Sequence, residues 1–178
     1  MNNKDGVPVN AVFGFTKMLI KLIDDLKPNY AAVIFDVSRK TFRNDLYDLY
    51  KANRSDPPEE LIPQFSIIRD ATHAIGLPVV EIPGFEADDL IATYSNIASK
   101  LKKKAIIVSS DKDLMQLVDD NTILFDPMKQ IWIDDAKVFE KFGVPPNKVV
   151  DVQSLAGDSS DNIPGVPGIG IKIAAELI

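Results

Sequence analysis

Cysteine is absent from the sequence, and histidine occurs only once, as His73. Without cysteine no disulfide bond and no thiolate metal site can form, and a reducing, cytoplasmic setting fits this composition. A single histidine also excludes zinc sites that are built from several imidazoles. We interpret His73 as a structural residue on the apolar face of a helix.

Long apolar runs are also missing. No stretch approaches the roughly 20 apolar residues that are needed to span a bilayer. The N-terminus lacks the apolar segment of a secretory signal peptide. The chain has 178 residues and a hydrophobic content of 46%, which is enough to bury a core, and one domain with an appendage is the expected organisation.

Net positive charge, the usual mark of a protein that binds nucleic acid, is absent too, because the net charge is −6. Eight of the acids, however, recur in short clusters. Setting these eight aside turns the net charge of −6 into +2, so the remaining surface suits DNA if the clustered acids surround metal ions. The clustered acids are Asp36, Glu86, Asp88, Asp89, Asp111, Asp113, Asp158 and Asp161.

Strands and helices alternate along the sequence. Apolar, β-branched runs predict strands at residues 31–35, 77–82, 105–108, 122–125 and 131–133, the last two forming a hairpin. Amphipathic periodicity predicts helices at residues 12–23, 63–74, 90–101 and 113–118. This order predicts an α/β fold with a doubly wound, mostly parallel sheet and helices on both faces. The pattern changes near Val144, so we expect a core over residues 1–144 and a helical appendage over residues 145–178.

Acids stand where three of the predicted strands end. They are Asp36 after the first strand, Glu86, Asp88 and Asp89 after the second, and Asp111 and Asp113 after the third. Ligands of open α/β sheets bind at the carboxyl ends of the strands, so these six carboxylates should converge at one edge. Helix capping is the alternative for Asp88, Asp89 and Asp111, which stand at the starts of predicted helices. No helix obviously begins at Asp36.

Converging carboxylates oppose one another's ionisation unless a counter-charge is present. A site with only oxygen ligands suits Mg²⁺ or Mn²⁺. Two such ions roughly 3.5–4 Å apart can activate a water molecule and stabilise the leaving oxygen of a phosphodiester. The predicted chemistry is therefore phosphodiester hydrolysis assisted by two metal ions.

Several motifs make the chain recognisable, and they occur in one order over nearly its whole length. The most specific are Glu86-Ala87-Asp88-Asp89, Ser110-Asp111-Lys112-Asp113 and Gly157-Asp158-Ser159-Ser160-Asp161-Asn162-Ile163-Pro164-Gly165, accompanied by Tyr50-Lys51-Ala52-Asn53-Arg54. In these motifs the sequence resembles the 5′→3′ exonuclease domain of bacterial DNA polymerase I and, more broadly, the flap endonuclease family with its PIN-like fold.

The resemblance implies an enzyme, a divalent-metal-dependent hydrolase that removes 5′ flaps and RNA primers during DNA replication and repair. It places all eight acids around two Mg²⁺ or Mn²⁺ ions and adds Lys51 and Arg54 to the catalytic residues. In natural relatives a polymerase module can follow in the same chain. A haloacid dehalogenase is the less favoured alternative, since that family needs a second Asp where Ser38 stands.

The family also has a first strand that ends in one more metal-binding Asp, before the first helix. Residues 1–4 are not apolar, so we do not match Asp5-Gly6 to that strand end. We expect a fragment that lacks both ends of the family domain. The alternative function is therefore a catalytically impaired, DNA-binding fragment of such a nuclease.

Two segments are expected to contact DNA. Basic and aromatic residues interleave between residues 39 and 54, which suits phosphate neutralisation and base stacking, although an ordinary solvated helix is the alternative. By resemblance, residues 38–60 form an arch over the active site, and the glycine-rich segment 165–172 begins a helix-hairpin-helix that grips the duplex backbone and can hold K⁺. The predicted DNA-binding residues are Arg43, Tyr50, Lys51, Arg54, Gly165, Gly168, Gly170 and Lys172.

Overall fold

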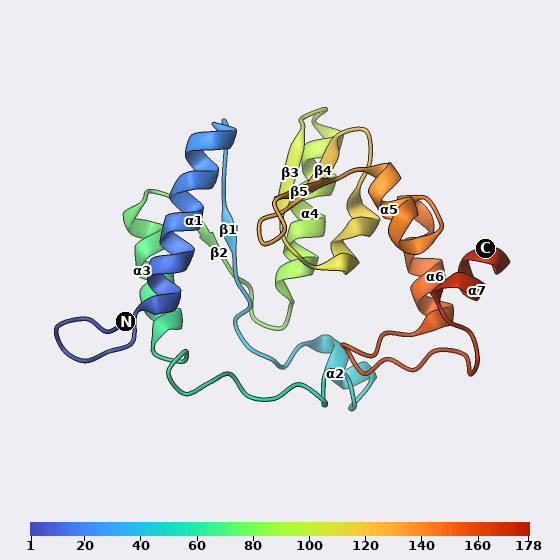
Figure 1. The fold of residues 1–178 in the computed structure, drawn as a ribbon, viewed down its shortest axis with the longest axis horizontal. Coiled ribbons are helices and arrows are strands. Elements are labelled where there is room, and N and C mark those ends of the chain that lie inside the picture. The colour runs from blue at the N-terminus through green and yellow to red at the C-terminus, as the bar shows by residue number, and fades with distance from the viewer. The chain divides into compact units, whose positions relative to one another are not determined.

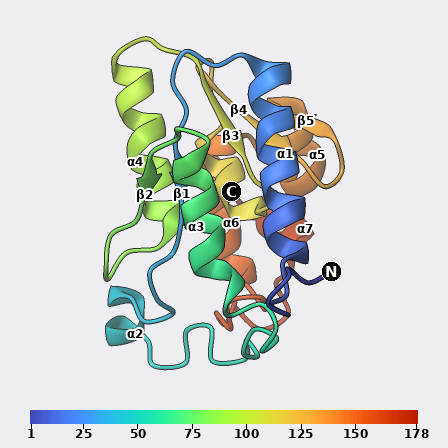
Figure 2. The same ribbon diagram turned by 90° about the vertical axis from the view of Figure 1, so that its left-hand side faces the viewer.

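The computed structural model describes all residues from 1 to 178, and they form two compact units. Unit 1 comprises Met1–Val37 and Ser55–Pro83, and unit 2 comprises Ser38–Arg54 and Gly84–Ile178. Figures 1 and 2 trace the chain through both units from two directions.

Unit 1 consists of two helices and two short strands. The helices are α1 (Asn10–Leu26) and α3 (Gln64–Ala74), and the strands are β1 (Val33–Ile34) and β2 (Val79–Val80). The strands are parallel, with Val33 opposite Val79. The two helices lie side by side in both views (Figures 1 and 2). No strand precedes α1, since the first residues form a loop closed by a bridge between Asn2 and Pro8.

The buried side chain of Gln64 holds the start of α1. Its Oε1 accepts hydrogen bonds from the backbone amides of Ala11 (2.8 Å) and Val12 (3.3 Å). Its Nε2 donates to Asn10 Oδ1 (3.1 Å) and to the carbonyl of Glu60 (2.9 Å). The first amides of a helix have no partner within the helix, and the N-cap residue of α1 supplies none from its side chain. A residue of α3 therefore supplies the cap of α1.

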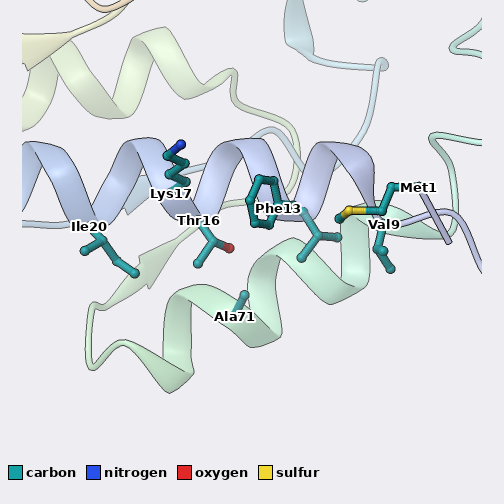
Figure 3. A pocket seen from close by; sticks show the side chains of 8 residues that line it. Met1, Val9, Phe13, Thr16, Lys17, Ile20 and Ala71 are labelled. Atoms are coloured by element: carbon teal, nitrogen blue, oxygen red, sulfur yellow. The ribbon is translucent and has the colours of Figure 1, made fainter. Parts of the chain in front are cut away.

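An apolar pocket of about 540 Å³ lies along α1 (Figure 3). Its lining residues are Met1, Val9, Val12, Phe13, Thr16, Lys17, Ile20 and Ala71. Phe13 and Ile20 remain exposed, and no residue of α1 is buried. The amphipathic helix predicted from the sequence is present, but its apolar face is only partly covered.

Unit 2 contains the remaining elements. Its helices are α2 (Phe42–Leu46), α4 (Ala87–Lys100), α5 (Asp135–Phe142), α6 (Val149–Ala156) and α7 (Ile171–Leu177), with 3₁₀ turns at Lys112–Leu117 and Pro146–Lys148. Its strands are β3 (Ala105–Val108), β4 (Thr122–Asp126) and β5 (Ile131–Ile133). β4 lies in the middle, parallel to β3 and antiparallel to β5.

One hydrophobic core joins the sheet of unit 2 to its C-terminal helices. Its buried residues are Ile107, Leu114, Val118, Leu124, Ile133, Val138, Phe142, Val144, Val149, Val152 and Ala174. The core continues beyond Val144 into α6 and α7, so these helices are packed into unit 2. The predicted domain boundary after residue 144 stays a prediction.

The α/β class and the PIN-like fold are confirmed, and all five predicted strands form. They form two sheets, β1–β2 and β3–β4–β5, where the sequence predicted one. β1 and β2 are shorter than predicted. Pro78 has no amide proton with which to extend the β2 ladder towards its N-terminus. The helix predicted at residues 113–118 is a 3₁₀ helix at Lys112–Leu117.

No helix combines the length and the apolar character that crossing a membrane requires.

Candidate active site

The clustered acids are divided between the two units. Asp36 belongs to unit 1, where it follows β1 and its carbonyl accepts a hydrogen bond of 3.0 Å from Arg69 Nη2. The other seven acids belong to unit 2. The convergence of Asp36 with them stays a prediction.

Within unit 2, a network of charged side chains surrounds the start of α4, and we call it the Glu86 cluster. Glu86 is the N-cap of α4, and Asp89 lies in its first turn. The Glu86 amide donates to Asp89 Oδ2 at 2.9 Å, so the capping role considered for Asp89 is confirmed. Asp88 lies in the same turn and is half-buried. The members of the cluster are Arg43, Tyr50, Lys51, Arg54, Glu86, Asp89 and Asp161.

Tyr50 and Lys51 both contact two carboxylates of the cluster. Lys51 Nζ donates to Glu86 Oε2 at 2.9 Å and lies 3.7 Å from Asp161 Oδ2. The Tyr50 hydroxyl lies 3.0 Å from Glu86 Oε2 and 3.1 Å from Asp161 Oδ2. Burial and the charges of Glu86 and Asp161 raise the pKa of Tyr50 far above its ordinary value. The neutral Tyr50 hydroxyl has one proton for two carboxylate acceptors and carries no positive charge. The ammonium group of Lys51 therefore supplies the charge that offsets the repulsion between Glu86 and Asp161.

Two arginines complete the cluster. The Nη1 and Nη2 atoms of Arg43 donate to the two carboxylate oxygens of Asp89, each at 2.8 Å. This pairing lowers the pKa of Asp89 below its usual range. Arg54 Nη2 pairs with Asp161 Oδ1. Three cations thus face three carboxylates, and their formal charges cancel.

Backbone contacts fix the Ser38–Arg54 segment beside the cluster. The Lys51 amide donates to the Asp161 carbonyl at 2.9 Å, and Lys51 itself has the left-handed φ of 54°. Asn53 Nδ2 donates to the Ser159 carbonyl (2.8 Å), and Asn162 Nδ2 donates to the Leu49 carbonyl (2.7 Å). Sequence reasoning missed both asparagines. They stand inside the quoted motifs, but their residue type gives no signal of a partner so far along the chain.

A second group of unit 2 surrounds Lys112, whose Nζ donates to Asp158 Oδ2 at 2.7 Å. Burial opposes the charge on Asp158, but the hydrogen bonds from Lys112 and Ser160 outweigh it and lower the pKa of Asp158. Asp113 accepts a hydrogen bond from Gln153, yet burial and then the charge of Asp111 raise the pKa of Asp113. Asp111 also caps the turn that follows, because its Oδ1 accepts from the Asp113 amide at 2.9 Å.

A cavity of about 560 Å³ connects parts of these two groups, and its lining includes Asp111, Asp113, Arg54 and Asp161. It is also lined by Asp126, an acid that the sequence reasoning missed. Asp126 ends β4, is 1% exposed and accepts hydrogen bonds from Ser110 Oγ (2.8 Å) and two backbone amides. The signal was available, since Asp126 follows a predicted strand as Asp36 does.

The carboxylates of this structure do not fit a divalent ion as they are arranged. Their donor chemistry suits Mg²⁺ or Mn²⁺, because every ligand atom is an oxygen. However, no three or more of the seven acids of unit 2 lie close enough together to hold one ion. Glu86, Asp89, Asp158 and Asp161 are each engaged by a lysine or an arginine instead.

The glycines of the C-terminal hairpin have different roles. Gly165 is packed tightly, since a Cβ there would lie 2.3 Å from the carbonyl carbon of Ala156. Gly168 has a φ of +80° in an open turn, and Gly170 is the N-cap of α7 with free space around it. Lys172 is exposed in the first turn of α7. Gly165 therefore shapes the loop, whereas Gly168 and Gly170 leave their backbone accessible and Lys172 leaves its side chain accessible.

Comparison with known proteins decides the family. The domain described as "5'-3' exonuclease, N-terminal resolvase-like domain" matches residues 1–143, and "5'-3' exonuclease, C-terminal SAM fold" matches residues 144–178. The chain belongs to the 5′-3′ exonuclease family. The resemblance inferred from the motifs is thereby confirmed.

Relatives of this exonuclease family include whole proteins and solved structures. The chain is 57% identical over 181 residues to the DNA polymerase I of Rhizobium leguminosarum. That match covers 98% of this chain and 18% of the polymerase. The chain is 39% identical over 178 residues to the 5'-3' exonuclease of Aquifex aeolicus. That match covers 100% of this chain and 62% of the Aquifex protein. Among solved structures, a phage T5 protein crystallised with metal ions matches with a TM-score of 0.82 and 25% identity, covering 94% of this chain and 67% of that one.

The chain thus spans only a part of these curated relatives, between 18% and 62% of their length.

Proposed function

We propose that the chain is the core of a divalent-metal-dependent 5′→3′ exonuclease and structure-selective 5′-flap endonuclease that hydrolyses DNA phosphodiesters. The Glu86 cluster carries this proposal, because it gathers three carboxylates and three cations in a member of the 5′-3′ exonuclease family. The phage T5 flap endonuclease, whose structure has been solved with DNA and metal ions, supports it through a matching fold.

In this proposal the acids hold two Mg²⁺ or Mn²⁺ ions, which would supply a nucleophilic water and neutralise the leaving oxygen. The candidate ligands are Asp36, Glu86, Asp88, Asp89, Asp111, Asp113, Asp158 and Asp161. Lys51, Arg54 and Arg43 would neutralise phosphates of the substrate, and Tyr50 would orient the carboxylates beside them. The proposed roles require the carboxylates and the basic side chains to exchange their present partners.

The C-terminal hairpin is proposed to bind the duplex through backbone phosphates at Gly168, Gly170 and Lys172. K⁺ at this hairpin and a cytoplasmic setting stay predictions from the sequence. We also propose that a polymerase module accompanies this core in the natural protein, as the name of the Rhizobium relative suggests.

The second candidate function is a DNA-binding fragment with impaired catalysis. It is favoured by one observation, the absence within unit 2 of three acids placed to share an ion. The two candidates differ in turnover, not in affinity for DNA.

Single-turnover cleavage of a labelled 5′-flap DNA in Mg²⁺ or Mn²⁺ separates them. We expect cleavage near the flap junction, none in EDTA, and none with Asp113→Asn. Binding of the flap without metal-dependent cleavage would establish the impaired fragment instead. The same duplex without a flap or a free 5′ end is the substrate control, and equal cleavage of it would overturn the 5′-end specificity.

A further inference from the structure

Two uncharged side chains join the segment that carries the predicted DNA contacts to the loop that follows α6. Asn53 Nδ2 donates to the Ser159 carbonyl at 2.8 Å, and Asn162 Nδ2 donates to the Leu49 carbonyl at 2.7 Å. The two hydrogen bonds run in opposite directions, because each segment supplies one asparagine and one carbonyl. We call this pair of hydrogen bonds the asparagine clasp.

The clasp surrounds a backbone conformation that the chain does not favour by itself. Lys51 has a left-handed φ of 54°, which a residue with a long side chain rarely adopts, and its amide donates to the Asp161 carbonyl at 2.9 Å. Asn162 has a φ of 58°, but asparagine tolerates this region better than most residues do. The clasp bonds lie on either side of Lys51 along the chain. They therefore restrain the backbone from which the side chains of Lys51 and Arg54 project.

The ion pairs of the same segment involve the cations that the proposed function assigns to DNA. Lys51 Nζ pairs with Glu86, and Arg54 Nη2 pairs with Asp161. These pairs are lost when the two cations turn to phosphates. The acceptors of the clasp are backbone carbonyls, which do not compete with a phosphate for a cation. The clasp is thus a set of contacts that can persist while the segment binds DNA.

We propose that Asn53 and Asn162 are positioning residues, which hold the backbone of residues 49–53 in place so that Lys51 and Arg54 contact DNA phosphates together. The inference rests on the proposed function, since it takes 5′-flap DNA as the ligand of these cations. It adds that two uncharged side chains control the electrostatic part of DNA binding without contacting DNA themselves.

This role predicts a change in salt dependence. Each phosphate contact steepens the fall of the binding constant with salt concentration, by about 0.9 in the logarithmic slope for duplex DNA. Removing the clasp should therefore flatten the slope, although it removes no charge. The loss of an uncharged hydrogen bond to DNA, by contrast, would weaken binding and leave the slope unchanged.

The test measures binding of 5′-flap DNA in EDTA by fluorescence anisotropy over a series of salt concentrations. We expect the slope to fall by about 1 to 2 in Asn53→Ala/Asn162→Gly, as it should in Lys51→Ala/Arg54→Ala. Glycine in place of Asn162 keeps the left-handed φ accessible, so this variant loses the side-chain amide and not the backbone conformation. Combining all four substitutions should flatten the slope no further than Lys51→Ala/Arg54→Ala does, because the asparagines act through these two cations.

Two single variants are the controls. The side chain of Asn53 is exposed, and glutamine can still donate from its amide, so Asn53→Gln should keep a slope closer to that of the wild type than Asn53→Ala does. Asn96 is exposed on α4 and lies outside the clasp, so Asn96→Ala should keep the wild-type slope.

The outcomes separate the inference from the proposed function. Weaker binding by Asn53→Ala/Asn162→Gly with an unchanged slope would overturn the inference, while the proposed function would stand. A wild type that does not bind flap DNA would overturn both. If the double variant loses its native circular dichroism spectrum, Asn53→Ala alone decides by the same slope, since this residue is exposed.

Discussion

The two units of the molecule are stabilised in different ways. Unit 2 has a continuous core of apolar side chains from β3 through α7. The buried residues of unit 1 are Gln64, Ile68 and Thr72, all on one face of α3. The stability of unit 1 thus depends more than that of unit 2 on the polar cap that Gln64 provides and on partly covered apolar side chains. The Glu86 cluster lies in unit 2, where rigid packing can hold buried ion pairs in fixed positions.

Substitution in the two cores should show the largest difference. Leu124, at the centre of the unit 2 sheet, is 0% exposed, whereas Phe13 of α1 is 57% exposed. We expect Leu124→Ala to lower the free energy of unfolding by about 2–5 kcal/mol, because it leaves a cavity in a packed core. Phe13→Ala should cost about 1 kcal/mol or less. Chemical denaturation of both variants measures the difference, and equal losses would show that unit 1 is as tightly packed as unit 2.

The polar cap of unit 1 should give a smaller, local effect. Gln64→Ala removes hydrogen bonds to Ala11, Val12, Asn10 and Glu60, which we expect to cost about 1–3 kcal/mol. Native-state hydrogen exchange should speed up at the first amides of α1 and stay unchanged in β3 and β4. Gln130→Ala, at an exposed glutamine with one local contact, is the control. Faster exchange throughout both units would mean that the two units unfold together.

Acid should weaken unit 2 through Asp89. The folded-state pKa of Asp89 lies below its ordinary value of 3.8, so its contribution to stability is complete above 3.8 and is lost as the pH falls through the folded pKa. Asp113 has a raised pKa, so its protonation favours the folded state and acts in the opposite direction. We expect Asp89→Asn to flatten the loss of stability below about pH 4. Asp113→Asn should instead act above pH 3.8, where it removes the gain of stability that protonation of Asp113 gives as the pH falls. Urea unfolding at several pH values measures both slopes, and parallel slopes for the two variants would refute the assignment.

The smallest effect is expected at Thr16 in the apolar pocket of unit 1. Its hydroxyl is buried and has no hydrogen-bond partner. Thr16→Val replaces it with a methyl group of similar size, which should raise the free energy of unfolding by up to about 1 kcal/mol. Thermal unfolding measures the change. A loss of stability would show that the hydroxyl has a partner in solution.

Local features of the fold were predictable from the sequence, whereas the pairings between distant residues were not. Periodicity placed α1, α3 and α4 correctly, and the apolar runs placed all five strands. The division into two sheets depends on which strands meet, and apolar runs do not encode that.

The site shows the same limit. Strand-end acids and the motifs identified Glu86, Asp89 and Asp161, and the resemblance supplied their roles. The partners could not be predicted, because Tyr50 and Asp161 are 111 residues apart and Arg43 and Asp89 are 46 apart. Only the folded chain shows that the predicted DNA contacts and the predicted metal ligands bind each other.

The most direct test of the proposed metal-dependent nuclease is the affinity for Mn²⁺ in the absence of DNA, measured by calorimetry. The double variant Lys51→Ala/Arg54→Ala lacks two of the internal counter-ions, and Lys137→Ala/Lys141→Ala removes two lysines from another wall of the same cavity. We predict that Mn²⁺ binds the first variant about tenfold more tightly than the wild type, and the second by a smaller factor. Equal or weaker Mn²⁺ binding by Lys51→Ala/Arg54→Ala would contradict the proposal that Glu86 and Asp161, which these two side chains pair with, are metal ligands.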